Sequence, residues 1–446
     1  MKNILLFFLF VVGVVNHGEG KIVRLHGSLK EFGKSVVIMD FDGAVGDVSK
    51  ARSQKIVVNE DGRFDFSFDL KKPGYYSVGR NTLYLTPGDD MEVYLGTSQP
   101  QSWFKGKGAD VNNYMKGRLF PHEGSFLRGG DNVKDDFEQT RKCIEELAAQ
   151  REKELKALQN VSKEFIELEM MRIKADVANS YMMYLWYSSL LRDKKTKEEK
   201  AKVISEFHNS IREYMNPLLK EISAKDKYLD IAVVRFVLLM CYDMDVFDFP
   251  KSKRLREFEC VCTMGERMEE EMIPSLYDEL YTWGAKLKQA DFKQAFLGRL
   301  EERAKLMEGR SAIDFIVLDM DGKERKLSDY KGKVMFVDFW ATWCGPCWGE
   351  MPHFIELSKK YPNIQFVGVA VDDTMKSWLK SMKKDTEHGN VLELFATDPF
   401  VRMKWDITGI PRFLLIDENF KIISASAPRP SQKDVIIPLL EKYSKK

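Results

Sequence analysis

The sequence predicts a multidomain chain with an N-terminal β sandwich or barrel, a central α-helical region and a C-terminal α/β domain. Three observations lead to this prediction: period-two alternation near the start, helical periodicity in the middle, and strands alternating with helices at the end. The length of 446 residues agrees with roughly three domains of about 150 residues each. We place the domains at residues 21–120, 121–308 and 309–446, after a leader at residues 1–20.

The composition excludes three broad classes of protein. Lys and Arg number 69 against 68 Asp and Glu, which leaves a formal net charge of +1. A nucleic-acid-binding surface needs a basic excess, so no nucleic-acid partner is expected. Aromatic residues make up 12% of the chain and hydrophobic residues 44%, whereas disordered chains are poor in aromatics. Six cysteines are too few for a scaffold built on disulfides.

The first residues have the pattern of a secretory signal. Lys2 precedes an apolar run at residues 4–15, and small residues at Gly18 and Gly20 favour cleavage before Lys21. The run is too short to cross a hydrocarbon core of about 30 Å as a helix. An uncleaved anchor or a buried strand is the alternative interpretation. Because no later stretch reaches about 18 apolar residues, the mature protein is expected not to span a membrane.

The segment from residue 21 to about residue 100 has the pattern of short β-strands. Phe64, Phe66 and Phe68 alternate with polar residues, which is typical of a strand with one buried face. Residues 59–62 and 87–90 are rich in Asn, Asp, Gly and Pro and indicate turns. Several short strands separated by such turns predict a small sandwich or barrel.

Helical periodicity extends from about residue 132 to residue 308. A patch at residues 170–186 is rich in Met and aromatic residues; it could line a ligand groove, but packing between helices is the favoured interpretation. Cys143 and Cys241 are expected to be small buried residues on helices. Apolar residues fall near helical spacing at Phe137, Cys143, Ile144, Leu147, Leu155 and Leu158.

From residue 309 onward the pattern alternates between strands and helices. Apolar runs predict strands at residues 334–340, 364–371 and 413–416. Amphipathic segments at residues 346–360 and 374–384 predict helices between them. This alternation implies a central sheet covered on both faces.

A pair of cysteines at the start of the first of these helices provides the chemistry. The N-terminus of a helix favours a thiolate, so the pKa of Cys344 should fall and its nucleophilicity should rise. Cys347, three residues on, lies on the same helical face and can attack a mixed disulfide formed at Cys344. A zinc site would need a second ligand pair, and Cys260 and Cys262 have the wrong spacing. No metal is therefore expected.

Residues 339–347, which read FWATWCGPC, resemble the active site of the thioredoxin superfamily. Within it, the chain is most similar to the exported TlpA/ResA-like thiol–disulfide oxidoreductases. The resemblance covers about residues 311–446 and implies a thioredoxin fold with a redox-active disulfide and no cofactor. Residues 84–89 are also similar to the β domain that often precedes such domains in exported bacterial proteins. The lead-in hairpin of the family is matched at residues 314–315, 319–323 and 327–333.

The resemblance also assigns roles to single residues. Ile410 and Pro411 match a loop whose proline follows a cis peptide bond, and the backbone of Ile410 would pair with an extended substrate. Trp343 is expected to contact the substrate as well. Asp338 matches a buried acid that takes a proton from the second cysteine. Glu350 matches an acid of the TlpA/ResA-like group, and the presence of both acids leaves open which of them relays protons.

The resemblance implies an exported enzyme of the periplasm or cell envelope that acts on protein substrates with disulfides. Gly345-Pro346 is the dipeptide of thioredoxin, whose reduction potential is about −270 mV against about −120 mV for the oxidant DsbA. A reductant is therefore favoured, and it would depend on an unknown membrane electron donor. The alternative is an envelope binding or scaffold protein with an accessory redox domain, because the N-terminal 300 residues greatly exceed the catalytic domain.

Short motifs bear on two other enzyme classes, phosphatases and peroxiredoxins. Residues 36–45 resemble the first motif of haloacid-dehalogenase-type phosphatases, in which Asp40 would attack phosphorus. The doubly wound domain that should follow is not indicated, so we interpret Asp40 to Gly43 as a strand end and a tight turn. A peroxiredoxin would need Thr or Ser three residues before its cysteine, and the chain has Ala341 and Cys344 at those places.

Overall fold

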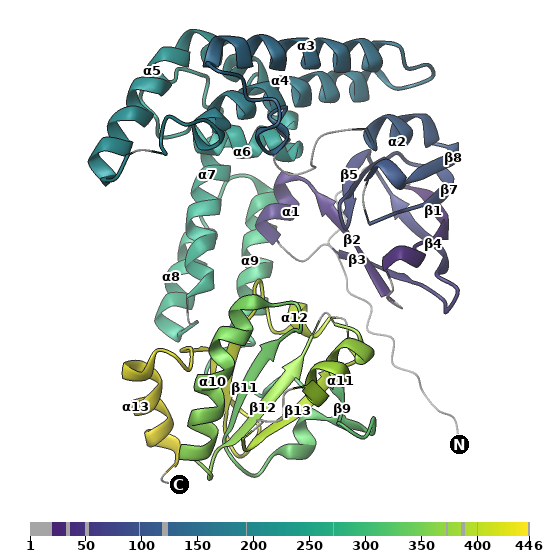
Figure 1. Ribbon diagram of the computed structural model, residues 1–446. Helices are drawn as coiled ribbons and strands as arrows, with labels where there is room; N and C mark the ends of the chain where they lie inside the picture. The colour runs from purple at the N-terminus through teal and green to yellow at the C-terminus, as the bar shows by residue number, and fades with distance from the viewer. Residues whose placement is uncertain are drawn as a thin grey trace. The chain divides into compact units, whose positions relative to one another are not determined.

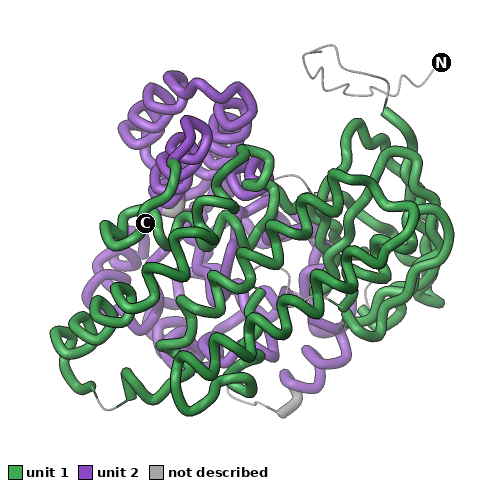
Figure 2. Tube along the Cα trace, turned by 90° about the horizontal axis from the view of Figure 1, so that it is seen from above, with its two compact units in different colours: residues 1–43, 53–250 green, residues 44–52, 251–446 purple. Residues whose placement is uncertain are grey.

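The computed structural model describes the chain from residue 20 to residue 444 with short gaps. The expected signal sequence therefore lies almost wholly outside the described residues. The described chain forms two compact units, Met1–Gly43 with Ser53–Pro250, and Ala44–Arg52 with Lys251–Lys446 (Figure 2). The described residues are 20–32, 36–49, 53–97, 99–117, 124–192, 194–270, 272–371, 373–384, 389–398 and 400–444.

The expected N-terminal β domain is present in unit 1 as paired sheets (Figure 1). One sheet has the strand order β4-β1-β7-β8 and the other the order β3-β2-β5-β6. Apolar residues of both sheets share one core, in which Phe64 of β4 is buried while Phe66 and Phe68 pack at its margin. The strands are β1 Lys21–Ser28, β2 Val36–Asp42, β3 Ser53–Val57, β4 Arg63–Leu70, β5 Gly74–Val78, β6 Asn81–Leu85, β7 Asp90–Tyr94 and β8 Trp103–Lys107.

The motif that resembles a phosphatase has no phosphatase architecture around it. Strand β2 ends at Asp42, as expected, but a short helix α1 (Ala44–Ser49) follows in place of a simple tight turn. The strands after it are consecutive and antiparallel, without the helices of a doubly wound domain. Asp42 is buried and forms an ion pair with Arg235, another residue of unit 1, at 2.8 Å.

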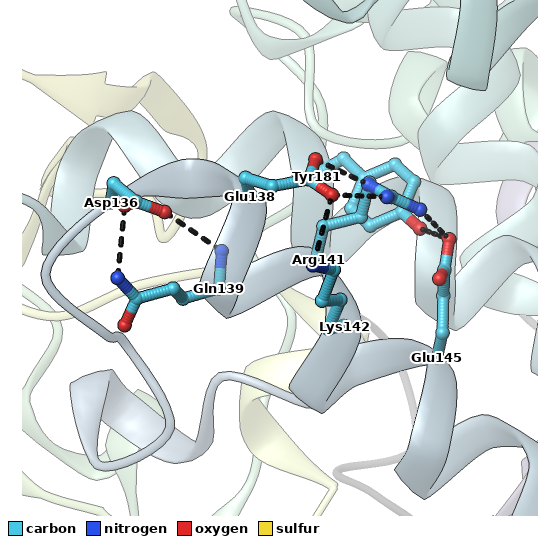
Figure 3. A network of polar contacts seen from close by, with 7 residues as sticks. All are labelled: Asp136, Glu138, Gln139, Arg141, Lys142, Glu145 and Tyr181. Atoms are coloured by element: carbon cyan, nitrogen blue, oxygen red, sulfur yellow. Dashed lines mark hydrogen bonds and ion pairs between the residues drawn. The ribbon is translucent and has the colours of Figure 1, made fainter.

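The remainder of unit 1 is helical, as the periodicity predicted. Side chains of Asp136, Ser162 and Thr196 cap the starts of α3, α4 and α5 by accepting backbone N–H bonds. Arg141 and the hydroxyl of Tyr181 both donate to Glu145, which joins α4 to α3 (Figure 3). The helices are α2 Ala109–Met115, α3 Phe137–Lys156, α4 Lys163–Tyr187, α5 Lys197–Ile222 and α6 Ala232–Met240.

The Met and aromatic patch and the central cysteines can now be placed. Tyr181, Met182 and Tyr184 of α4 are buried. This burial supports the interpretation that the patch packs between helices and does not line a ligand groove. Cys241 is buried, as expected. The prediction for Cys143 was wrong: it is only partly buried, because the adjacent Ile144 occupies the core face of α3.

Unit 2 contains the predicted C-terminal α/β domain, together with helices that precede it. Its sheet has the strand order β10-β9-β13-β12-β11-β14-β15, with β11, β12 and β13 parallel (Figure 1). β13 and β15 were not anticipated from the sequence. The strands are β9 Ile316–Leu318, β10 Glu324–Lys326, β11 Met335–Trp340, β12 Gln365–Ala370, β13 Val391–Ala396, β14 Arg412–Ile416 and β15 Ile422–Ala427.

The helices of unit 2 place a distinct apolar cluster on each face of this sheet. On one face, Phe336 of β11 packs against Phe354 of α10 and shares a cluster with Ile436 of α13. On the other face, Val337 shares a cluster with Val401 of α12. The helices are α7 Lys253–Glu266, α8 Pro274–Gly284, α9 Ala290–Ala304, α10 Gly345–Lys360, α11 Met375–Lys384, α12 Val401–Lys404 and α13 Lys433–Ser444.

Candidate active site

The two cysteines of the FWATWCGPC segment form a disulfide at the start of α10. Cys344 is the N-cap residue of the helix, and its sulfur accepts a hydrogen bond from the backbone N–H of Cys347 at 3.2 Å. The positive end of the helix dipole therefore points at this sulfur and favours its thiolate after reduction. Cys344 is 3% exposed and Cys347 is fully buried, so an incoming sulfur can reach Cys344 more readily than Cys347.

The loop that leads from β11 into the disulfide is held at Thr342 by two hydrogen bonds. The backbone N–H of Thr342 donates to a carboxylate oxygen of Asp373 at 2.7 Å. The indole N–H of Trp348, on α10, donates to the backbone carbonyl of Thr342 at 3.0 Å. The next residue, Trp343, has a side chain that is 61% exposed. The loop therefore presents a large apolar surface beside a buried disulfide.

The loop before β14 faces the disulfide, as the resemblance implied. The peptide bond between Ile410 and Pro411 is cis, and the carbonyl oxygen of Ile410 lies 3.7 Å from the sulfur of Cys344. A groove of about 430 Å³ adjoins this loop. Its lining includes Thr408, Ile410, Pro411, Arg412, Arg429 and Gln432.

Asp338 lies inside the sheet, on the face that α10 covers. Its side chain is completely buried, and neither carboxylate oxygen has a hydrogen-bond partner within the part of the chain that the structure describes. Burial raises the pKa of Asp338 well above its usual value, and the negative charges of Glu393 and Glu350 raise it further. A carboxyl group with a raised pKa can exchange a proton with a thiol near neutral pH.

Glu350 is in a different environment from Asp338. It is 7% exposed, and its two carboxylate oxygens accept hydrogen bonds from the backbone N–H and the hydroxyl of Ser431, at 3.0 and 2.8 Å. The guanidinium of Arg429 lies 4.0 Å away. These partners hold the side chain of Glu350 toward the start of α13.

Comparison with known proteins identifies the C-terminal part of the chain. Residues 307–435 match the Redoxin family. The thiol–disulfide oxidoreductase ResA of Geobacillus kaustophilus is 44% identical over 138 residues, which are 30% of this chain and 77% of that protein. The chain belongs to the ResA family of thiol–disulfide oxidoreductases. The ResA protein of Bacillus cereus is 29% identical over 161 residues, 34% of this chain and 84% of that protein.

The ResA-like part of the chain also matches a solved structure. A crystal structure of a Bacteroides vulgatus protein described as a thiol–disulfide oxidoreductase is 42% identical; it covers 31% of this chain and 99% of that one, with a TM-score of 0.30. The region before residue 307 is outside the family match. Within the described residues, no helix is long and apolar enough to cross a membrane, and no cluster of His, Cys, Asp and Glu is arranged to hold a metal.

The structure brings the sequence-predicted residues of this ResA-like domain together around one helix terminus. Cys344, Cys347 and Ile410 meet directly, and Asp338 and Glu350 are close enough for the charge of Glu350 to act on Asp338. Sequence reasoning missed Glu393, a buried acid on β13 that affects Asp338. Its only sequence signal is a single acid within the apolar run VLELFA at residues 391–396.

Proposed function

We propose that this protein is an exported reductase of disulfide bonds in protein substrates, with Cys344 as the attacking cysteine and Cys347 as the resolving cysteine. The observation that carries the proposal is the disulfide at the start of α10, beside the exposed Trp343 and the backbone of Ile410. Family membership supports thiol–disulfide exchange as the reaction.

The reaction proceeds in two exchanges. The thiolate of Cys344 attacks one sulfur of the substrate disulfide, the substrate S–S bond breaks, and one substrate thiolate leaves. Cys347 then loses its thiol proton to a carboxylate and attacks the sulfur of Cys344, which expels the second substrate thiolate. Two electrons pass from the enzyme to the substrate, and the enzyme is left with its disulfide. A membrane electron donor must then reduce this disulfide before the next cycle.

Asp338 is the better candidate for the proton acceptor in the second exchange. Both carboxylate oxygens of Glu350 already accept hydrogen bonds from Ser431, so this side chain is engaged by another partner. Asp338 has no such partner in the described residues, and burial raises its pKa. A base of higher pKa takes a thiol proton more readily.

An extended segment of the substrate would lie across the loop at Ile410 and Pro411. Because the carbonyl of Ile410 faces Cys344, a backbone hydrogen bond to it would bring a substrate sulfur in line with the attacking cysteine. The exposed ring of Trp343 would add apolar contact at the same place. This arrangement favours unfolded or extended protein segments over small disulfides.

The reduction potential of the pair Cys344 and Cys347 tests the proposed direction. The full chain would be equilibrated with defined thiol buffers, and its free thiols would be quantified with Cys347→Ser as the control for the other cysteines. We expect a value near or below about −250 mV, on the thioredoxin side of the scale. A value above about −180 mV would indicate an oxidase or isomerase. A pair that does not titrate would favour the binding or scaffold function.

Export to the periplasm or cell envelope is the second part of the proposal. It rests on the basic start, the apolar run and the small residues of the leader at residues 1–20. We expect the mature protein to begin at Lys21 and to be recovered from the envelope or periplasmic fraction. N-terminal sequencing of that fraction checks this, and an intact leader on cytoplasmic protein would contradict it.

A further inference from the structure

Three residues line up across the parallel strands behind the disulfide. Asp338 on β11 is paired in register with Gly368 on β12, and Gly368 is paired with Glu393 on β13. Residues paired across neighbouring strands point to the same face of a sheet. The face is the one covered by α10, because Phe336 and Trp340, two residues to either side of Asp338, pack against that helix.

Gly368 leaves the space through which Glu393 approaches Asp338. A Cβ atom at residue 368 would lie 2.5 Å from Oε2 of Glu393 and 2.9 Å from its Cδ. The carboxylate of Glu393 therefore lies over the backbone of Gly368, in the place where a side chain of β12 would stand. Neighbouring strands are about 4.8 Å apart, so this carboxylate is about one strand spacing from Asp338.

The surroundings of the two carboxyl groups are apolar. On one side lies the cluster of Trp340, Trp378 and the disulfide, and on the other the cluster around Phe336 and Phe413. Asp338 is fully buried, whereas Glu393 keeps 6% of its surface exposed. Like charges this close in an apolar setting repel each other, so the negative charge of Glu393 disfavours the ionised form of Asp338.

We propose that Glu393 is a positioning residue for Asp338: its carboxylate, which lies over Gly368, sets the charge beside the buried acid that takes the proton of Cys347. The inference rests on the proposed function, since it concerns the second exchange of that reaction. The proton moves from the thiol of Cys347 to the carboxylate of Asp338, and no electrons move in this step.

The charged groups that act on Asp338 come from two elements. α10 contributes Glu350, and β13 contributes Glu393. Cys347 lies on the same helix as Glu350. The paired residues on the flanking strands, Gly368 on β12 and Phe413 on β14, carry no charge. Substitution of Glu393 therefore leaves Cys347 and Glu350 unchanged in the variants compared.

The experiment follows the second exchange directly. Reduced full-length protein is mixed rapidly with an aromatic disulfide whose released thiolate is coloured. Cys344 releases the first thiolate, and Cys347 releases the second. Cys347→Ser, which lacks the second release, supplies the baseline that includes reaction at the exposed Cys260. The rate of the second release is recorded from about pH 5 to pH 9, a range in which a general base with a raised pKa titrates.

For Glu393→Gln we expect the midpoint of the acid limb to shift to lower pH by about one unit, because the negative charge beside Asp338 is lost. The plateau should fall several-fold because the base is weaker. Gly368→Ala should shift the profile in the same direction, because its methyl group displaces the carboxylate while the charge is kept. Glu356→Gln, an exposed acid of α10 paired with Lys433, is the matched control and should follow the wild type.

Two results would overturn the inference. One is a Glu393→Gln profile with the wild-type midpoint. The other is a shift that persists when Glu393→Gln is combined with Asp338→Asn, since a residue that acts through Asp338 must lose its effect there. If the wild type itself shows no second release, the proposed function fails; if it does and only these comparisons fail, the role of Glu393 alone is wrong.

Discussion

Replacement of Asp338 by Asn separates the ionisation of the buried acid from its shape. The two side chains have nearly the same volume, so the substitution leaves no cavity in the sheet. Burial holds the pKa of Asp338 well above its usual value in the folded protein. In the unfolded chain the same carboxyl has an ordinary pKa of about 3.9. The variant therefore removes a group whose proton affinity changes on folding.

The sign of the effect follows from proton linkage. Above about pH 4 the unfolded chain has lost the proton of Asp338 while the folded protein still holds it, so the free energy of unfolding falls as the pH rises. One proton gives a slope of up to about 1.4 kcal/mol per pH unit. The free energy of unfolding of Asp338→Asn, relative to that of the wild type, should therefore increase with pH at up to this slope. The increase should end when the pH passes the pKa of Asp338 in the folded protein. The buried amide adds a cost of about 1–3 kcal/mol that does not depend on pH.

Urea denaturation of the oxidised full chain at a series of pH values measures this slope. Tryptophan fluorescence reports mainly on the ResA-like domain, which contains Trp340, Trp343, Trp348, Trp378 and Trp405 of the 8 tryptophans in the chain. Asp321→Asn, an exposed acid between β9 and β10, is the control and should show a constant difference from the wild type. Parallel curves for Asp338→Asn and the wild type across this range would refute the reasoning.

Further predictions concern the cysteines, the substrate surface and the domain boundary. Cys347→Ser should trap mixed disulfides with substrate proteins and Cys344→Ser should not, as read by non-reducing gels; equal trapping by both would reverse the assigned roles. Trp343→Ala should raise KM for a peptide disulfide about tenfold, equivalent to about 1.4 kcal/mol, with little change for a small aromatic disulfide; equal effects on both would argue against substrate contact. Residues 309–446 expressed alone should fold and reduce disulfides, as checked by circular dichroism and turnover; an aggregated fragment would contradict the proposed boundary.

Local patterns in the sequence were sufficient to locate the redox pair. The apolar strand before Cys344 and the helix that begins after it follow from periodicity, and the chemistry follows from two cysteines at a helix start. The cis bond at Pro411 was expected from the resemblance, and the structure confirms it. β13 was missed because its run at residues 391–396 is short and contains an acid, which gives no clear period.

The acids behind the disulfide show where sequence reasoning stops. Asp338 and Glu350 were both candidates, and their sequence positions did not distinguish them. The structure does so by their partners: Ser431, far along the chain, binds Glu350, whereas Asp338 is buried without a hydrogen bond in the described residues. Such differences depend on contacts between distant segments, which no local pattern encodes.

By itself, the sequence determined that this protein has a dithiol at the start of a helix, between strands of an α/β domain. That information is local, because a strand, a helix start and a pair of cysteines three residues apart are written in consecutive residues. Which carboxyl groups gather behind the helix that carries the dithiol depends on contacts between distant segments. The alignment of Asp338, Gly368 and Glu393 depends on the register of three strands, and the raised pKa of Asp338 depends on the water that folding excludes from around it.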